Sequence, residues 1–184
     1  MLEIQAGKLP AWQTTRKSAW VKGRMETHLG PPPLLYKRMR FVAHLPSHFL
    51  YTPSHFWLEA EGENRWRIGL TKFASRMLGE MVDYGFDAAL EAPVNSGQVI
   101  GWIEGFKAVS DLFCVAEGRF AGGNPALQDN ITLVNKDPHG SGWLYAVVGK
   151  PWNQAVDVRG YAAILDQTID RLASKPEVAP PSPA

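Results

Sequence analysis

Lys107 is the residue of this chain whose surroundings best suit covalent chemistry. It stands in the stretch IEGFKAVSDLF, residues 103–113, as the one cation among apolar, small and acidic side chains. Apolar runs lie on both sides, QVIGWI before and LFCVA after, which predicts a bend between two strands. An amine at the tip of a hairpin is accessible to the active site of another enzyme. The pattern therefore indicates a lysine that can be modified covalently.

Glycines frame this predicted hairpin. Gly97 lies ten residues before Lys107 and Gly118 lies eleven residues after it, and both are expected to shape the turns at the feet of the hairpin. Gly105 lies within the bend 104–108, where a residue without a Cβ permits backbone angles that other residues avoid. A lysine in a bend of this kind is more often an ordinary exposed residue than a modified one, so the functional interpretation depends on further residues.

Other candidates for chemistry are weaker. The single cysteine, Cys114, excludes an internal disulfide and a zinc site made of cysteines alone, and we interpret it as a small buried hydrophobic residue. The segment GGNPAL lacks the Gly-Lys-Ser/Thr of a phosphate-binding loop. No metal site is predicted, because metal-ligand spacing on a common helix face is absent among His28, His44, His48, His55 and His139.

Composition indicates an ordinary soluble domain. The 184 residues are 45% hydrophobic and 20% charged, which is typical of one globular domain. The apolar runs are far shorter than the roughly 20 residues of a membrane-spanning helix, and an apolar signal segment is absent near the first residues. We therefore expect a cytoplasmic protein without membrane contact.

The charge distribution is uneven. Residues 1–47 hold eight Lys or Arg and two Glu, a net charge of +6, whereas residues 48–184 have a net charge of −5. A basic segment of this kind is expected to be a disordered leader. Three alternatives are a start codon assigned too early, with Met25 or Met39 as the true start, a contact with nucleic acid or an acidic partner, and an organelle transit peptide.

Short strands separated by turns predict a mainly β sandwich or barrel for the body of the chain. Strands are expected over 55–61, 65–70, 80–86, 98–105, 111–118, 119–123 and 143–148. A short helix is predicted over 71–78, with Thr71 as its N-cap and Gly79 at its end. NPALQDN is expected to be a helical turn.

The C-terminal part differs from this body. Tyr161, Leu165, Thr168 and Leu172 form one helical stripe beside Ile164 and Ile169, which predicts an amphipathic helix over about 158–173. The last residues are rich in proline and are expected to be disordered. The expected division is a leader (1–47), a β domain (48–150), a helical extension (151–174) and a tail (175–184).

Several segments together resemble the glycine cleavage system H protein family. IEGFKAVSDLF is similar to the lipoylation hairpin of the family, whose pattern is Glu-Ser-Val-Lys-Ala-Val/Ala-Ser-Asp/Glu. HFW at 55–57, RIGLTKFASRMLGEMV at 67–82 and DNITLVNKDPHGSGWLY at 129–145 resemble further family segments. They occur in the family order with consistent spacing, and the resemblance covers about 50–148.

The resemblance implies a flattened sandwich of two small antiparallel sheets with a lipoyl-bearing hairpin. It implies that Lys107 carries lipoic acid in an amide bond. The protein would then be a carrier, not an enzyme, which shuttles an aminomethyl group and reducing equivalents between partner enzymes. The implied partners are glycine decarboxylase, aminomethyltransferase, dihydrolipoyl dehydrogenase and the lipoylating enzyme. Recognition of the hairpin would involve Glu104, Gly105, Phe106 and Asp111. A monomer that binds no nucleic acid is expected.

This chain also departs from the family pattern. Gly105-Phe106 replaces Ser-Val before the lysine, Val115 and Ile131 replace prolines, and His139 replaces a tyrosine. Biotin is disfavoured as the attached group because methionine does not flank Lys107. Two alternatives to the glycine cleavage carrier stay open. One is an H-like lipoyl carrier for another pathway, such as sulfur oxidation or lipoyl relay, and the other is an interaction domain without lipoate.

Overall fold

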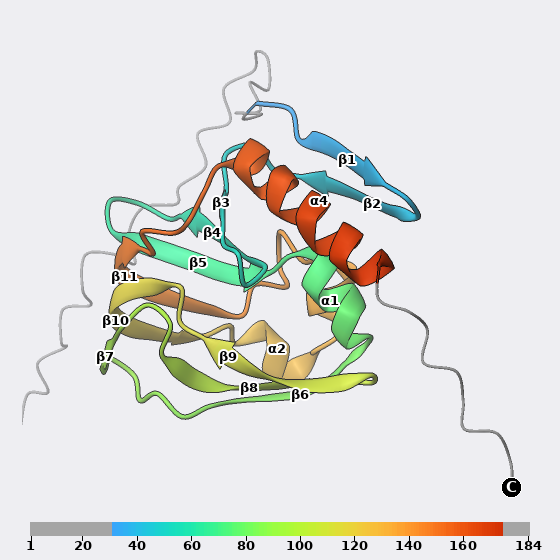
Figure 1. Cartoon of the computed structure of the whole chain (residues 1–184). Coiled ribbons are helices and arrows are strands. Elements are labelled where there is room, and N and C mark those ends of the chain that lie inside the picture. Colours follow the sequence, from blue (N-terminus) through green and yellow to red (C-terminus); the bar gives the residue numbers. More distant parts are fainter. Residues whose placement is uncertain (1–30, 175–184) are drawn as a thin grey trace, which may run out of the picture.

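Two antiparallel sheets form the body of the protein in the computed structural model, which describes residues 31–174. One sheet has six strands in the order β3 (Leu50–Tyr51), β4 (Phe56–Ala60), β5 (Arg65–Leu70), β11 (Tyr145–Pro151), β10 (Ala116–Gly123) and β7 (Pro93–Val94). The other has three strands in the order β6 (Met81–Phe86), β8 (Val99–Gly105) and β9 (Ala108–Phe113). Figure 1 shows the three-stranded sheet below the six-stranded one. The expected mainly β fold is confirmed.

The main hydrophobic core joins these two sheets. Ile68 of β5, Ile103 of β8 and Leu112 of β9 are all buried in it. Strand alternation explains their position, because every second side chain of a half-buried strand faces the core. The outward residues of the three-stranded sheet are left free to form a functional surface.

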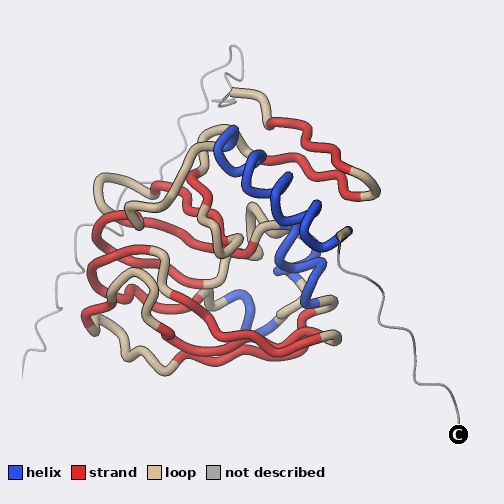
Figure 2. The backbone as a smooth tube through the Cα atoms, viewed as in Figure 1, coloured by secondary structure: helices blue, strands red, loops and turns tan. Residues whose placement is uncertain are grey.

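Short helices fill the connections between strands (Figure 2). α1 (Lys72–Leu78) begins at Thr71, whose hydroxyl accepts a hydrogen bond from the backbone N–H of Ala74, and ends at Gly79. Gly79 has a φ of 89°, a left-handed conformation that glycine adopts without strain. Both helix boundaries predicted from the sequence are therefore confirmed. α2 (Ala126–Asp129) matches the expected helical turn, whereas α3 (Leu133–Lys136) was not predicted.

One predicted strand, 111–118, is wrong in its extent. The structure has β9 ending at Phe113 and β10 beginning at Ala116, and β10 also includes the separate short strand expected at 119–123. The chain leaves the three-stranded sheet and enters the six-stranded sheet between them. Cys114 and Val115 lie at this crossing and are both buried, so the apolar run continues although the strand does not.

A further hairpin corrects the expectation of a disordered leader over 1–47. β1 (Leu34–Arg38) pairs with β2 (Phe41–Leu45), and Tyr36, Phe41 and Leu45 are buried. They belong to a second core cluster that includes residues of the C-terminal helix. The hairpin is ordered because its apolar face packs on a helix far away in the sequence. Residues 1–30 and the predicted disordered tail, 175–184, lie outside the described residues.

The C-terminal helix is present as α4 (Val158–Ala173). Its buried face is Val158, Tyr161, Leu165 and Ile169, whereas Leu172 is exposed. Tyr161 and Leu165 of the predicted stripe are therefore buried as expected, whereas Ile169 replaces Thr168 and Leu172 on the buried face. The proposed domain boundaries within 48–174 stay a prediction.

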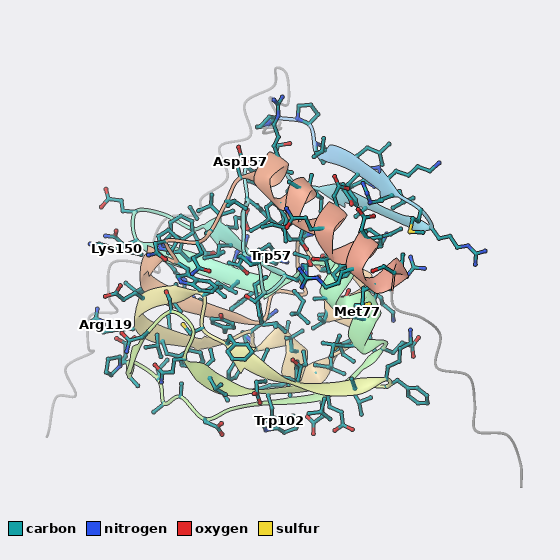
Figure 3. The ribbon with its side chains drawn as sticks, in the orientation of Figure 1. Trp57, Met77, Trp102, Arg119, Lys150 and Asp157 are labelled. Atoms are coloured by element: carbon teal, nitrogen blue, oxygen red, sulfur yellow. The ribbon has the colours of Figure 1, made fainter. Side chains whose placement is uncertain are left out.

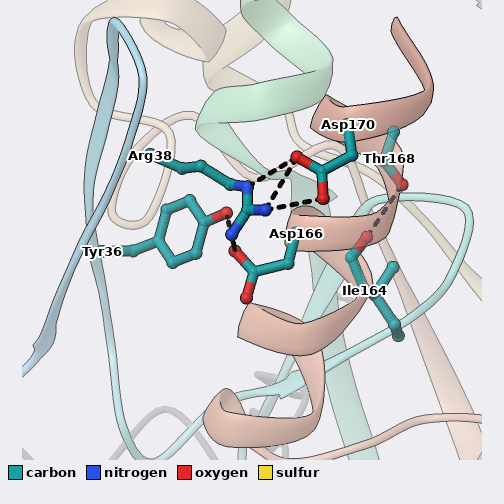
Figure 4. A network of polar contacts seen from close by, with 6 residues as sticks. All are labelled: Tyr36, Arg38, Ile164, Asp166, Thr168 and Asp170. Atoms are coloured by element: carbon teal, nitrogen blue, oxygen red, sulfur yellow. Dashed lines mark hydrogen bonds and ion pairs between the residues drawn. The ribbon is translucent and has the colours of Figure 1, made fainter. Parts of the chain in front are cut away.

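Polar contacts hold β1 against α4 (Figure 4). The Arg38 guanidinium forms ion pairs with Asp166 at 2.8 Å and with Asp170 at 2.6 Å. The Tyr36 hydroxyl donates a hydrogen bond to the same Asp166 carboxylate at 2.8 Å. The fork geometry of arginine suits two carboxylates on successive turns of a helix. These contacts fix the position of the β1–β2 hairpin on the helix.

Candidate functional site

The predicted lysine hairpin is formed by β8 and β9. Gly105 pairs with Ala108 at the end of the ladder, so Phe106 and Lys107 alone form the turn, which is tighter than the five-residue bend expected. Both side chains are exposed, and Phe106 is 85% accessible to solvent. Lys107 is therefore at the tip of a short antiparallel hairpin, where a partner enzyme can reach its amine.

The backbone of this turn is anchored to the last residue of α1 and to the loop that follows it. The N–H of Phe106 donates to the carbonyl of Glu80 at 2.8 Å, and the N–H of Lys107 donates to the carbonyl of Leu78 at 2.9 Å. Gly105 makes this close approach possible, because a Cβ there would overlap the Leu78 carbonyl. Two consecutive backbone N–H groups thus hold the turn, and the end of α1 fixes the backbone of Lys107.

Asn135 of α3 supports that loop from the other side. Its side-chain oxygen accepts a hydrogen bond from the N–H of Met81 at 2.8 Å, and its amide donates to the carbonyl of Gly79 at 2.9 Å. Asn135 was not among the site residues expected from the sequence. The asparagine lies in LVNKD, within a segment quoted for the family resemblance, and that segment was the available signal.

Lys107 lies along α1 in this structure. Its Nζ donates to the carbonyl of Arg76 at 3.5 Å, a long contact at an exposed position. A groove of about 520 Å³ adjoins the amine. It is lined by α1, the two turn residues, the loop after α1 and Asn135. The amine is therefore free to leave this contact, and the surface beside it is concave.

A second, more apolar pocket of about 220 Å³ lies under the same hairpin. β9 contributes Ser110, Asp111 and Phe113, and α1 contributes Phe73 and Met77 among others. The predicted site residue Asp111 thus lines a pocket, although it lies four residues from the turn. Ser110, which the sequence matched without a role, shares the same lining.

Carboxylates gather on the outer face of the hairpin. Strand register places Glu104 opposite Val109 on β9 and opposite Asp83 on β6. Asp111 lies two residues from Val109 on the same face. Like charges placed opposite each other across strands destabilise a sheet, so this face has an acidic character that packing does not require. The structure brings Glu104, Gly105, Phe106 and Lys107 together, with Asp111 nearby.

The two glycines at the feet of the hairpin differ in kind. Gly97 has a φ of 85° and donates its N–H to the carbonyl of Cys114 at 2.8 Å, so it occupies a turn as expected. Gly118 corrects the expectation, because it lies inside β10 opposite Gly149 of β11. A Cβ at Gly118 would overlap the carbonyl of Val148. Its role is close approach of two strands, not a turn.

A buried polar group joins α4 to the start of α1. The Tyr161 hydroxyl lies 2.8 Å from Thr71 Oγ1 and 3.0 Å from His55 Nδ1. Burial lowers the pKa of His55 to about 4, so the imidazole is neutral near pH 7. Its Nδ1 shares one hydrogen bond with the Tyr161 hydroxyl. This group positions the N-terminus of the helix that anchors the lysine turn.

Within residues 31–174, no helix is long and apolar enough to cross a membrane. No cluster of three or more His, Cys, Asp or Glu side chains within this range has the arrangement of a metal site.

Several known proteins are similar to this chain in sequence and fold. Residues 49–160 match the family model described as glycine cleavage H-protein. The H protein of Bacteroides fragilis is 38% identical over 126 residues, covering 66% of this chain and 97% of that protein. The H protein of Corynebacterium jeikeium is 35% identical, covering 65% and 95%. A crystal structure of the Mycobacterium marinum H protein superposes with a TM-score of 0.60 at 30% identity, covering 66% of this chain and 99% of that one.

Fold and hairpin together define a lipoyl-type β domain. Because the family model and the relatives match more than half of the chain, the chain belongs to the glycine cleavage H-protein family. Members of this family are carriers rather than catalysts, and they are typically lipoylated. The matched segment begins after β2 and ends near the start of α4, so the β1–β2 hairpin and most of α4 lie outside it.

Proposed function

We propose that this protein is the lipoyl carrier of a glycine cleavage system, with Lys107 as the attachment site. The observation that carries the proposal is the two-residue turn of β8–β9, which presents Lys107 at its tip within the segment matched by the family. The lipoyl carboxyl group would form an amide with Lys107 Nζ, with net loss of water, and this removes the charge of the lysine.

The residues present fit such a group. Lys107 is exposed, its backbone N–H is held by Leu78, and a concave surface lies beside its amine. A rigid base with a free amine is what a long covalent arm requires, because the arm then moves while its origin stays fixed. Bound lipoate would supply a dithiolane that accepts reducing equivalents and an aminomethyl group, and the chain itself supplies position and recognition.

The hairpin residues have distinct roles in this proposal. Gly105 sets the approach of the turn to α1. Glu104 and Asp111 give the outer face a negative charge that the lipoylating enzyme can recognise, and Phe106 offers an exposed apolar contact. Glycine decarboxylase, aminomethyltransferase and dihydrolipoyl dehydrogenase are the proposed users of the arm, in the cytoplasm.

Two observations favour a second candidate, an H-like lipoyl carrier for another pathway. The exposed Phe106 stands beside the attachment lysine, and the β1–β2 hairpin lies outside the matched segment. Both change the surface that a partner meets. This alternative shares the lipoyl-lysine and differs only in the enzymes that act on it.

The experiment compares two lysine variants of the full chain in a reconstituted system. Lys107→Arg keeps the positive charge but cannot accept lipoate in an amide bond, whereas Lys136→Arg changes an exposed lysine of α3. The lipoylated wild type and Lys136→Arg should support glycine-dependent turnover with the three enzymes of the same genome, and Lys107→Arg should support none. Turnover by Lys107→Arg would overturn the attachment site. A lipoylated wild type without turnover would favour the second candidate.

A further inference from the structure

Two hairpin turns lie on either side of α1. The turn of β1–β2 is Met39-Arg40, and the turn of β8–β9 is Phe106-Lys107. Each consists of a large apolar residue followed by a cation. Figure 1 shows both turns and α1 along the same side of the molecule. Of the two turns, only the second was expected from the sequence to have a function.

Two cavities connect these turns through Arg76 of α1. One is the groove beside Lys107, and the other is a pocket of about 220 Å³ lined by Met39, Arg40 and Met77 among others. Arg76 lines both cavities, and its guanidinium carbon lies 5.9 Å from the centre of the Phe41 ring. The two turns and α1 therefore form one continuous surface, which we call the docking face and define as Met39, Arg40, Arg76, Met77 and Phe106.

The docking face is cationic. Arg40, Arg76 and the adjoining Lys72 and Lys107 form no ion pair within residues 31–174, whereas Arg38 is neutralised by two aspartates of α4. Glu80 lines the groove beside Lys107, and the described residues that line the second pocket include no carboxylate. The excess of positive charge remains after Lys107 loses its own charge on modification.

The docking face is also apolar at its exposed points. Met39 is 68% and Met77 is 50% accessible to solvent, and Phe106 is the most exposed large apolar side chain among the described residues. Protein interfaces are enriched in methionine, aromatic residues and arginine. This combination suits a protein surface better than a polyphosphate, which would need cations alone.

We propose that the docking face binds a partner enzyme that acts on the Lys107 arm and that presents carboxylates around an apolar contact. The inference rests on the proposed carrier function and specifies the chemistry of the partner. The β1–β2 hairpin contributes Met39 and Arg40 from outside the matched family segment. The contacts of Arg38 with α4 hold this turn beside α1. The hairpin and α4 thereby build half of a recognition surface for the arm.

The test measures binding and turnover separately. Unmodified full-length protein is titrated against each purified enzyme, namely the lipoylating enzyme, glycine decarboxylase, aminomethyltransferase and dihydrolipoyl dehydrogenase. Arg40→Glu/Arg76→Glu reverses two charges of the docking face. Lys150→Glu is a control that reverses one charge on β11, and Figure 3 shows Lys150 on the opposite side of the molecule from Met77.

The charge-reversed variant should weaken binding to at least one enzyme by about tenfold or more at low salt, and the difference should shrink as salt rises. Lys150→Glu should stay within about twofold of the wild type. Met39→Asn tests the apolar contact, because asparagine tolerates the left-handed φ of 51° at this position. It should weaken binding to the same enzyme at all salt concentrations, whereas Leu90→Asn, at an exposed apolar position elsewhere, should not.

Equal binding by the charge-reversed variant and Lys150→Glu for all four enzymes would overturn the inference. Tighter binding of the docking face to a mixed-sequence RNA oligonucleotide than to any enzyme would also overturn it. Mass spectrometry of the native protein separates this failure from failure of the carrier function. If the wild type is lipoylated and active but charge reversal in the docking face changes no binding, the docking inference fails and the carrier function holds. If the native protein is not lipoylated, the carrier function fails, whereas a measured loss of enzyme binding would still support the docking face.

Discussion

Gly105 sets how closely the lysine hairpin approaches α1. A Cβ at this position would overlap the carbonyl of Leu78, and that same carbonyl accepts the hydrogen bond from the N–H of Lys107. The smallest residue is therefore needed where the turn is anchored. The sequence predicts Gly105 within the bend because of unusual backbone angles, whereas the structure has it as the last residue of β8, in close contact with Leu78.

Gly105→Ala should displace the lysine turn from α1. We expect a destabilisation of about 1–3 kcal/mol, typical of an overpacked site, and slower lipoylation of Lys107 by the purified lipoylating enzyme. Gly97→Ala is the comparison, because its Cβ would meet open space but its φ is left-handed. That variant should lose about 1–2 kcal/mol and keep a normal lipoylation rate. Equal rates for the two variants would contradict the anchoring role of Gly105.

His139 gives the fold a dependence on pH. Burial lowers the pKa of His139 to about 4, and burial lowers that of His55 to about 4 as well. In the unfolded chain a histidine binds its proton below about pH 6.5. The unfolded state therefore takes up protons first, and stability falls as pH drops from 6.5 towards 4.

His139→Tyr should reduce this pH dependence. Each of these half-buried histidines contributes up to about 1.4 kcal/mol per pH unit within the window, and tyrosine does not titrate there. Urea unfolding at several values between pH 4 and pH 7 measures the slope, and His55 should supply what remains. Asp137 affects stability in a separate, more acidic range of pH, because hydrogen bonds from Ser141 lower its pKa. An unchanged slope in the variant would be evidence against a neutral, half-buried His139.

At the scale of elements, the lysine turn depends on three segments that are distant in sequence. The turn of β8–β9 donates to the end of α1 and to the loop after it, and Asn135 of α3 bonds to both ends of that loop through Gly79 and Met81. Sequence periodicity found α1 and both of its caps, because Thr71 and Gly79 are local signals. It missed α3, whose four residues are too few to show a helical period.

Asn135→Ala should loosen the lysine turn without removing any group from it. The loss of one donor and one acceptor leaves the Met81 N–H and the Gly79 carbonyl unpaired, which costs about 1–3 kcal/mol. Hydrogen exchange at Phe106 and Lys107 should accelerate. Asn130→Ala, at the exposed residue that caps the end of α2, should leave exchange at the turn unchanged. If both variants leave the exchange unchanged, Asn135 does not support the turn.

At the scale of the whole molecule, the ends of the described chain meet on one side of the body. β1–β2 packs against α4, and α4 contacts the start of α1 through Tyr161. The sequence predicted α4 from its period, but it assigned residues 34–45 to a disordered leader. Basic charge and nearby prolines led to that error, since the alternation of Phe41, Ala43 and Leu45 has meaning only once a partner for their common face is known.

Tyr161→Phe should weaken the union of α4 with the body. The phenylalanine ring can keep the stacking on Tyr51, but the hydroxyl shared by Thr71 and His55 is lost. We expect a loss of about 1–3 kcal/mol in the free energy of unfolding, measured by urea titration. Tyr84→Phe, at a half-buried position of β6, should lie close to the wild type. Equal stabilities of the two variants would show that the shared hydroxyl contributes little.

Mass spectrometry of the protein from its native cells shows whether Lys107 carries lipoate. We expect one lipoyl increment on the intact chain, located on the peptide that contains Lys107. An unmodified Lys107, in cells whose other lipoyl proteins are modified, would rule out the carrier and favour an interaction domain without the cofactor.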